Sequence, residues 1–128
     1  MPGRTEKLST IGTDPQIIVH DMSVAPGMIV KGRLGYLRDG KCLVVQGERA
    51  GEKFTASPAW PKGVEPVLTG DKRGVKVPGF GVISEGDSIV AGGNFWGVGD
   101  TRAKGVEIDA RCLAQDGFIV FNADSFES

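Results

Sequence analysis

The sequence has few of the residues that carry the commonest enzymatic and metal chemistry. Its 128 residues include one histidine and two cysteines, Cys42 and Cys112. Structural zinc sites usually need four nitrogen or sulfur ligands, so we expect no metal site, and no cofactor either. Two cysteines without C-x-x-C spacing do not make a disulfide framework. We therefore expect two reduced, buried thiols, with a single Cys42 to Cys112 bridge as the alternative.

Motifs for nucleophilic catalysis and phosphate binding are also missing. There is no G-x-S-x-G elbow, and the glycine-rich segment 92–97 lacks the Lys-Ser or Lys-Thr step of a phosphate loop. His20 is followed by Asp21, and a histidine beside a carboxylate can act as a general base. Neighbouring residues of a strand point to opposite faces, however, which favours a hydrogen-bonded or exposed His20 without a catalytic role.

Charge of one sign is scarce. The chain has 15 basic and 16 acidic residues and a net charge of −1 at pH 7, whereas a nucleic-acid-binding surface must neutralise several phosphates. No apolar run is long enough to cross a bilayer, and none follows the charged start of the sequence. We therefore expect a soluble, cytoplasmic protein whose partners are neither nucleic acid nor membrane.

Glycine and β-branched residues, in contrast, are abundant. The 20 glycines are about twice the usual share, and 22 valines and isoleucines stand against six leucines. Because β-branched side chains pack well on pleated sheets and lose rotamer freedom in helices, this composition predicts an all-β protein. The length is typical of one domain.

Short apolar runs separated by turn residues predict seven or eight strands. Asp39-Gly40 and Asp116-Gly117 predict tight turns, the first a type I′ hairpin. Three prolines between residues 58 and 66 should keep that segment at a sheet edge or in a surface loop, because proline cannot donate to a ladder. The runs lie at 17–20, 28–37, 42–46, 53–56, 67–68, 75–77, 82–83, 88–91, 106–112 and 118–121.

This spacing of strands predicts a small antiparallel β-barrel of OB-like or similar topology, with a β-sandwich as the alternative. Half of the 20 glycines lie between Gly70 and Gly105, and glycines within strands permit the sharp coiling of a tight barrel. The barrel domain should span residues 17–122. Residues 1–16 are expected to form a flexible arm or an adaptable edge segment, and 123–128 an acidic tail.

The aromatic residues supply the candidate binding site. Phe95 and Trp96 lie in segment 92–100, which its glycines predict to be a loop, and large rings in such a loop need a partner surface. Trp60 lies on a stiff, proline-flanked backbone that suits either covering the core or presenting the ring. Rings sharing one barrel end would either plug it or outline a binding mouth, with arginines to contact a carboxylate or phosphate. The candidate binding residues are Trp60, Arg73, Asn94, Phe95, Trp96, Asp100 and Arg102.

Two carboxylate pairs have the spacing that places both groups on one face of a strand. We expect Glu85 and Asp87 to lie in a turn, with Asp87 accepting hydrogen bonds from nearby backbone amides. Glu107 and Asp109 alternate with apolar residues and are expected on a solvated face. Neither pair is therefore assigned to acid–base chemistry.

Four spaced segments resemble a class of small bacterial β domains. They comprise Gly-Lys-Cys-Leu at 40–43, Trp-Pro-Lys-Gly at 60–63, the strand at 75–77, and Glu-Gly-Asp at 85–87 followed by the glycine pair at 92–93. The resemblance covers about half of the chain, from residue 30 to residue 95. It implies an all-β fold and no particular activity.

These observations predict a non-enzymatic binding module that contacts a small molecule or a protein, including a second copy of itself, through an aromatic, glycine-rich barrel end. One alternative is a cofactor-free, cyclase- or isomerase-like enzyme that shapes its substrate inside the barrel. A deep cavity lined by His20, aspartate or arginine would favour the enzyme. A second alternative is weak binding of single-stranded nucleic acid on an OB-like face. Its basic residues would be Lys31, Arg33, Arg38 and Lys41.

Overall fold

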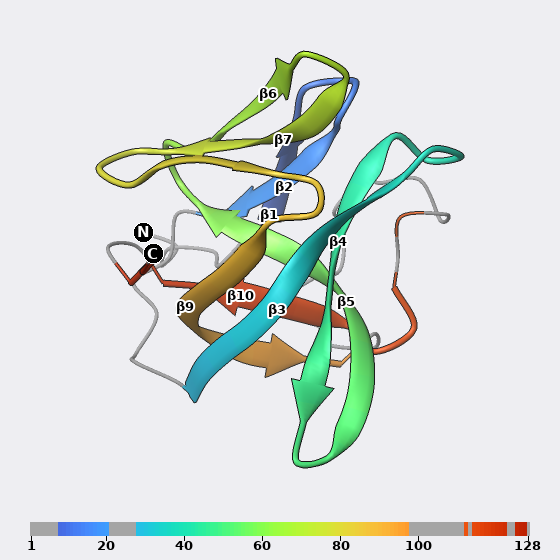
Figure 1. The fold of residues 1–128 in the computed structure, drawn as a ribbon, viewed down its shortest axis with the longest axis vertical. Helices are drawn as coiled ribbons and strands as arrows, with labels where there is room; N and C mark the ends of the chain where they lie inside the picture. The colour runs from blue at the N-terminus through green and yellow to red at the C-terminus, as the bar shows by residue number, and fades with distance from the viewer. Residues whose placement is uncertain (1–7, 21–27, 98–111, 113, 123–124, 128) are drawn as a thin grey trace, which may run out of the picture.

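The structure is a computed structural model that describes residues 8–20, 28–97, 112, 114–122 and 125–127. Strands dominate these ranges, so the all-β prediction is confirmed (Figure 1). The described ranges hold ten strands, more than the seven or eight expected for the chain. They are β1 (Leu8–Ile11), β2 (Ile17–His20), β3 (Met28–Leu37), β4 (Cys42–Arg49), β5 (Glu52–Pro61), β6 (Glu65–Thr69), β7 (Lys72–Val77), β8 (Gly81–Ser84), β9 (Ser88–Trp96) and β10 (Phe118–Phe121).

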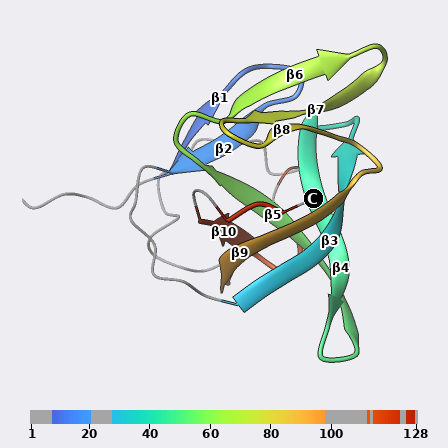
Figure 2. The ribbon, with the colours of Figure 1, turned by 60° about the vertical axis from the view of Figure 1, so that its left-hand side comes forward.

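The strands form two sheets. Seven strands pair in the order β1-β2-β5-β10-β9-β3-β4, and three pair in the order β6-β7-β8. Because β4 pairs with β5 as well as with β3, the pairings run from β5 through β10, β9, β3 and β4 and return to β5. The three-stranded sheet lies at one end of the molecule and the tip of the β4–β5 hairpin at the other (Figures 1 and 2).

The main core fills the space between these strands. It draws buried residues from both sheets, such as Leu34 of β3, Trp60 of β5, Val75 of β7 and Phe121 of β10. Burying side chains of this size is the largest favourable contribution to folding, about 1.5–3 kcal/mol for each. A second, smaller cluster, which includes Leu8, Trp96 and Phe118, lies on the other face of the seven-stranded sheet.

The position of β5 corrects two expectations. The segment with Pro58 and Pro61 is an interior strand, and its pairings with β10 and β2 are parallel, so the large sheet is mixed rather than antiparallel. The register explains how the prolines are accommodated. Pairing with β4 ends at Ala56, and pairing with β2 begins at Ala59. Pro58 lies between these two ladders, so its missing N–H removes a hydrogen bond from neither β4 nor β2. Pro61 is the last residue of the strand.

The β3–β4 hairpin is present where expected, but its turn differs. Leu37 pairs with Cys42, and the positive φ of 56° belongs to Lys41, so the turn is not of type I′. The turn at Asp116-Gly117 does require its glycine. Gly117 has a φ of 88°, and a Cβ there would collide with the carbonyl oxygen of Trp96.

The two cysteines form a disulfide, which corrects the expectation of reduced thiols. Cys42 and Cys112 are 70 residues apart in sequence, their Cα atoms are 5.9 Å apart, and both are buried. The bridge joins the start of β4 to the chain just before β10. The strand expected at 106–112 lies, except for Cys112, outside the described residues.

Both ends of the described chain pack against the fold. Leu8–Ile11 pairs with β2 at the edge of the large sheet, as an edge segment rather than a flexible arm. Near the other end Phe126 stacks on Trp60, with ring centroids 5.9 Å apart, and Glu127 pairs with Val90. Residues 126 and 127, within the expected tail, therefore contact the fold.

Candidate functional site

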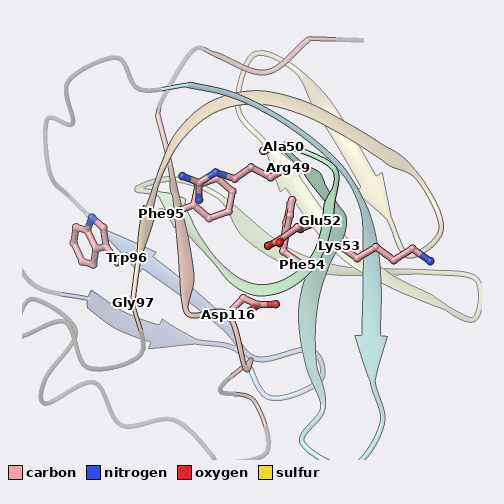
Figure 3. Close-up of a pocket in the computed structure, with 9 residues that line it drawn as sticks. All are labelled: Arg49, Ala50, Glu52, Lys53, Phe54, Phe95, Trp96, Gly97 and Asp116. Atoms are coloured by element: carbon pink, nitrogen blue, oxygen red, sulfur yellow. The ribbon is translucent and has the colours of Figure 1, made fainter.

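The expected aromatic loop is the end of strand β9, and this separates its two rings. Gly93 of β9 allows β10 to approach closely, because a Cβ at this position would lie 3.0 Å from the carbonyl oxygen of Val120. Successive side chains of a strand point to opposite faces. Phe95 accordingly packs against the main core, while Trp96, 4% exposed, belongs to the second cluster. Figure 3 shows the Trp96 ring directed away from the side chains around Phe95.

Phe95 lies in a cleft between the tip of the β4–β5 hairpin, the end of β9 and the turn before β10 (Figure 3). The cleft has a volume of about 530 Å³, within the range of small-molecule sites. Nine residues line it: Arg49, Ala50, Glu52, Lys53, Phe54, Phe95, Trp96, Gly97 and Asp116.

Two phenylalanine rings make the apolar wall of the cleft. Phe54 of β5 meets Phe95 edge to face, with ring centroids 5.3 Å apart, a favourable aromatic geometry. Phe54 is 9% exposed and is part of the main core. Its ring lies across Gly47 of β4, where a Cβ would be 2.9 Å from the ring and 2.6 Å from the carbonyl oxygen of Lys31. Glycine at 47 therefore allows the ring to occupy this position.

Arg49 covers the other ring. Its guanidinium carbon is 4.3 Å from the centroid of Phe95, a cation–π distance. Among the residues that the structure describes, no carboxylate forms an ion pair with Arg49 and no acceptor receives a hydrogen bond from it. Lys53 adds a second cation to the lining.

Asp116, the described carboxylate on the β10 side of the cleft, already accepts a hydrogen bond. The backbone N–H of Thr55 donates to Asp116 Oδ2 at 2.8 Å, and the N–H of Asp116 donates to the carbonyl of Thr55 at 3.1 Å. Asp116 therefore holds the turn before β10 against β5. This contact positions the cleft, and Asp116 forms no ion pair with Arg49 or Lys53.

The other sequence-predicted site residues do not join Phe95 in the cleft, apart from Trp96. Trp60 is 0% exposed and stacks on Phe121, with centroids 5.2 Å apart, so it covers the core and does not present its ring. Asn94 is half-buried and, by alternation along β9, lies on the opposite face from Phe95. Asp100 and Arg102 lie outside the described residues.

Arg73 lies at the opposite end of β3 from the cleft. Its Nη2 and Nε donate to the Asp14 carboxylate at 3.2 and 3.3 Å, and its guanidinium lies 4.8 Å from the centroid of the Tyr36 ring. The Tyr36 hydroxyl also donates to Asp14, at 2.6 Å. Tyr36 lies near the end of β3 that pairs with the start of β4. The other end of β3, at Met28, pairs with Gly93, two residues before Phe95.

These contacts shift the protonation of all three groups. The hydrogen bond from Tyr36, and then that from Arg73, hold the pKa of Asp14 below its usual value of 3.8. Burial, and then the hydrogen bond to Asp14, raise the pKa of Tyr36. The hydrogen bond to Asp14 likewise raises the pKa of Arg73. The cluster is a closed arrangement in which each charge has its partner.

The remaining candidates for chemistry have structural roles. His20 is buried, and its Nε2 lies 2.7 Å from the carbonyl oxygen of Phe121, to which it donates. The expected hydrogen-bonded His20 is thus confirmed. Asp87 accepts from the N–H of Ser84, as expected for a turn, whereas Glu85 accepts from the N–H of Arg73 on the neighbouring strand β7. Glu107 and Asp109 lie outside the described residues.

Sequence reasoning missed most of the cleft. Arg49 and Glu52 lie between the apolar runs expected as strands at 42–46 and 53–56, and Phe54 lies in the second of these runs. Alternation along β5 could have assigned Phe54 to the core face. No local signal indicates that the hairpin tip lies beside Phe95, because that depends on pairings between distant strands.

No family model, no curated protein and no solved structure matches this chain. Within the described ranges, no group of three or more histidine, cysteine or acidic side chains is arranged to hold a metal ion. No helix in the same ranges is long and apolar enough to span a membrane.

Proposed function

We propose that the protein is a non-enzymatic binding module that holds its ligand in the cleft between the β4–β5 hairpin and the end of β9. The observation that carries this proposal is the exposed guanidinium of Arg49, stacked on Phe95 above an apolar wall. A concave site with aromatic side chains and a few oriented polar groups is the usual form of a ligand site.

The proposal includes a barrel. The return of the strand pairings to β5 supports a small, five-stranded barrel formed by β3, β4, β5, β9 and β10, in place of a sandwich. In that arrangement the Phe54 and Phe95 rings plug one end, and the cleft lies outside them. The ligand would contact the barrel end without entering its interior.

The alternative functions have weaker support. An enzyme of the kind considered above needs a cavity lined by His20, aspartate or arginine, but His20 is buried and is not part of the cleft lining. Binding of single-stranded nucleic acid needs basic residues beside the aromatic ones. The four residues expected for this role, Lys31, Arg33, Arg38 and Lys41, do not line the cleft, and Arg38 and Lys41 belong to the turn at the opposite end of β3 from Phe95.

We also propose an oxidising compartment as the place where the protein works. Buried disulfides are typical of secreted, periplasmic or surface proteins and are rare in the cytosol. The bridge between Cys42 and Cys112 supports this location over the expected cytoplasmic one.

The test is a screen of small molecules against the full chain labelled with nitrogen-15, read by amide chemical shifts. We expect the binders to move the signals of Phe54, Phe95 and Gly97. Phe95→Leu, which removes the stacked ring, should weaken binding. Phe80→Leu, the same change at a partly exposed ring outside the cleft, should not. Binders that cluster elsewhere, or a screen without any binder, would contradict the proposal.

A further inference from the structure

Within the described residues, two arginines lie over aromatic rings, and they differ in their carboxylate partners. Arg73 lies over Tyr36 and receives the carboxylate of Asp14 at its guanidinium edge. Arg49 lies over Phe95 at a similar distance and has no such carboxylate among the described residues. The pairing of Arg73 with Asp14 shows that the group missing at Arg49 is a carboxylate.

We infer that the ligand of the cleft carries a carboxylate attached to an apolar group, and that this carboxylate binds Arg49 as Asp14 binds Arg73. The inference rests on the proposed function and adds the chemical class of the ligand. In this complex the protein supplies the cation, Arg49, and the apolar wall, and the ligand supplies the carboxylate and the apolar group.

Stacking prepares Arg49 for this role. A guanidinium presents five N–H donors in one plane, in a fork that matches the two oxygens of a carboxylate. The Arg49 guanidinium lies over the Phe95 ring, and none of its N–H groups donates to a described residue, so these donors are available to a ligand. Arg49 is exposed, so a ligand can reach these donors without rearrangement of the hairpin.

The carboxylates around the cleft leave this position open. Asp116 accepts the N–H of Thr55 and is fixed by it. Glu52 is opposite Arg49 in the β4–β5 register, yet the two make no ion pair. The lining holds two cations, Arg49 and Lys53, and two carboxylates, Glu52 and Asp116, so attraction for an anion comes from the local position of Arg49 and not from a net charge of the cleft.

The apolar group follows from the wall. Phe54 and Phe95 offer ring edges and faces to a small hydrophobic group, and a volume of about 530 Å³ accommodates a ring with a short linker. Two sources have this chemistry: a free arylalkyl acid, and the C-terminal carboxylate of a peptide that ends in an aromatic residue.

The probes of the experiment are 3-phenylpropionate, its neutral amide, and a tetrapeptide ending in phenylalanine with either a free or an amidated C-terminus. Binding is followed by amide chemical shifts in the full chain. We expect at least one of the acids to move the cleft signals and to bind about tenfold more tightly than its amide, as for a charge-assisted bidentate pair. The acid that binds more tightly identifies the source.

Two variants test the role of Arg49. Arg49→Gln should lower the affinity for the acid about tenfold and remove the preference over the amide, while Arg49→Lys should keep part of the affinity but lose the bidentate geometry. Arg38→Gln makes the same charge change at an exposed arginine at the opposite end of β3, and should leave binding unchanged.

The failure of this inference can be distinguished from the failure of the proposed function. Equal binding of acid and amide in the cleft, or binding of the acid that Arg49→Gln does not weaken, would overturn the carboxylate class while keeping the cleft as a site. A cleft that responds to no acid, no amide and no other molecule of the screen would overturn both.

Discussion

The two ends of strand β3 use similar side chains for different purposes. At one end, called here the paired end, Arg73 stacks on Tyr36 and binds Asp14, and the Cys42 to Cys112 disulfide lies close by at the start of β4. At the other, the cleft end, Arg49 stacks on Phe95 without a carboxylate among the described residues.

The difference separates stability from binding. Asp14, Tyr36 and Arg73 come from the β1–β2 connection, from β3 and from β7, so their contacts tie the small sheet to the large one. Arg49 and Phe95 join only the hairpin tip to the end of β9. Changes at the paired end should therefore alter unfolding, whereas changes at the cleft end should alter binding.

The largest expected effect is at the disulfide. Replacing Cys42 and Cys112 together by serine should lower the free energy of unfolding by about 2–5 kcal/mol, because the bridge constrains a long loop of the unfolded chain. Urea unfolding of the variant and the parent measures this. Free thiols in the native parent, detected by intact mass after alkylation without reductant, would contradict the bridge itself.

The wall of the cleft should come next. Phe54→Ala removes a ring that is 9% exposed and part of the main core, at an expected cost of about 3 kcal/mol. Phe95→Ala should cost less because Phe95 is only partly buried. Thermal unfolding of both variants compares the losses of stability. A larger loss for Phe95→Ala than for Phe54→Ala would contradict the deeper burial of Phe54 in the main core.

Asp14→Asn tests the paired end through pH. The pKa of Asp14 is lowered in the folded state, so its contribution to stability is present above its unfolded pKa of about 3.8 and is lost as the pH falls through the folded value. The parent should therefore be more stable than the variant at neutral pH, and the difference should vanish in acid. Urea unfolding at several pH values provides the measurement. A difference that does not depend on pH would exclude the carboxylate as its source.

The same variant changes the tyrosine titration. Tyr36 is the only tyrosine in the sequence, so its absorbance reports a single group. Its pKa is raised by burial and by the hydrogen bond to Asp14. In Asp14→Asn the absorbance transition should move to lower pH, toward the ordinary value, because the Asp14 carboxylate that repels the Tyr36 phenolate is gone. An unchanged transition would mean that burial alone sets the pKa.

The smallest effect on stability is expected from Arg49→Gln. An exposed cation–π contact contributes about 0.5–1 kcal/mol, so unfolding should change by no more than this. Arg73→Gln should destabilise the protein more, because Arg73 also loses its bonds to Asp14. Urea unfolding of the pair decides the order, and the reverse order would remove the distinction between the two ends.

Local patterns in the sequence predict much of the fold. The apolar runs at 28–37 and 118–121 became β3 and β10, and Asp116-Gly117 made its turn, since these features depend on alternation and on backbone freedom at glycine. Proline chemistry misled the assignment of β5, because a missing N–H is harmless where neighbouring strands change.

The candidate site was predictable in part. Phe95 was singled out as an aromatic residue of a glycine-rich loop; it lies instead near the end of strand β9, where it lines the cleft. Trp60 has similar local signals, yet it is fully buried by Phe121 and Phe126, which lie more than 60 residues further along the chain. The disulfide and the approach of Arg49 to Phe95 are likewise long-range contacts, which residue spacing does not encode.

The most direct test follows the side-chain Nε–H signals of the arginines while 3-phenylpropionate is added to the nitrogen-15-labelled protein. Arg49 has an open guanidinium edge and Arg73 is held by Asp14. The predicted result is a saturating shift of the Arg49 signal with the Arg73 signal unmoved. A stationary Arg49 signal during binding, or a shift of Arg73 instead, would contradict the assignment of the cleft end as the binding end.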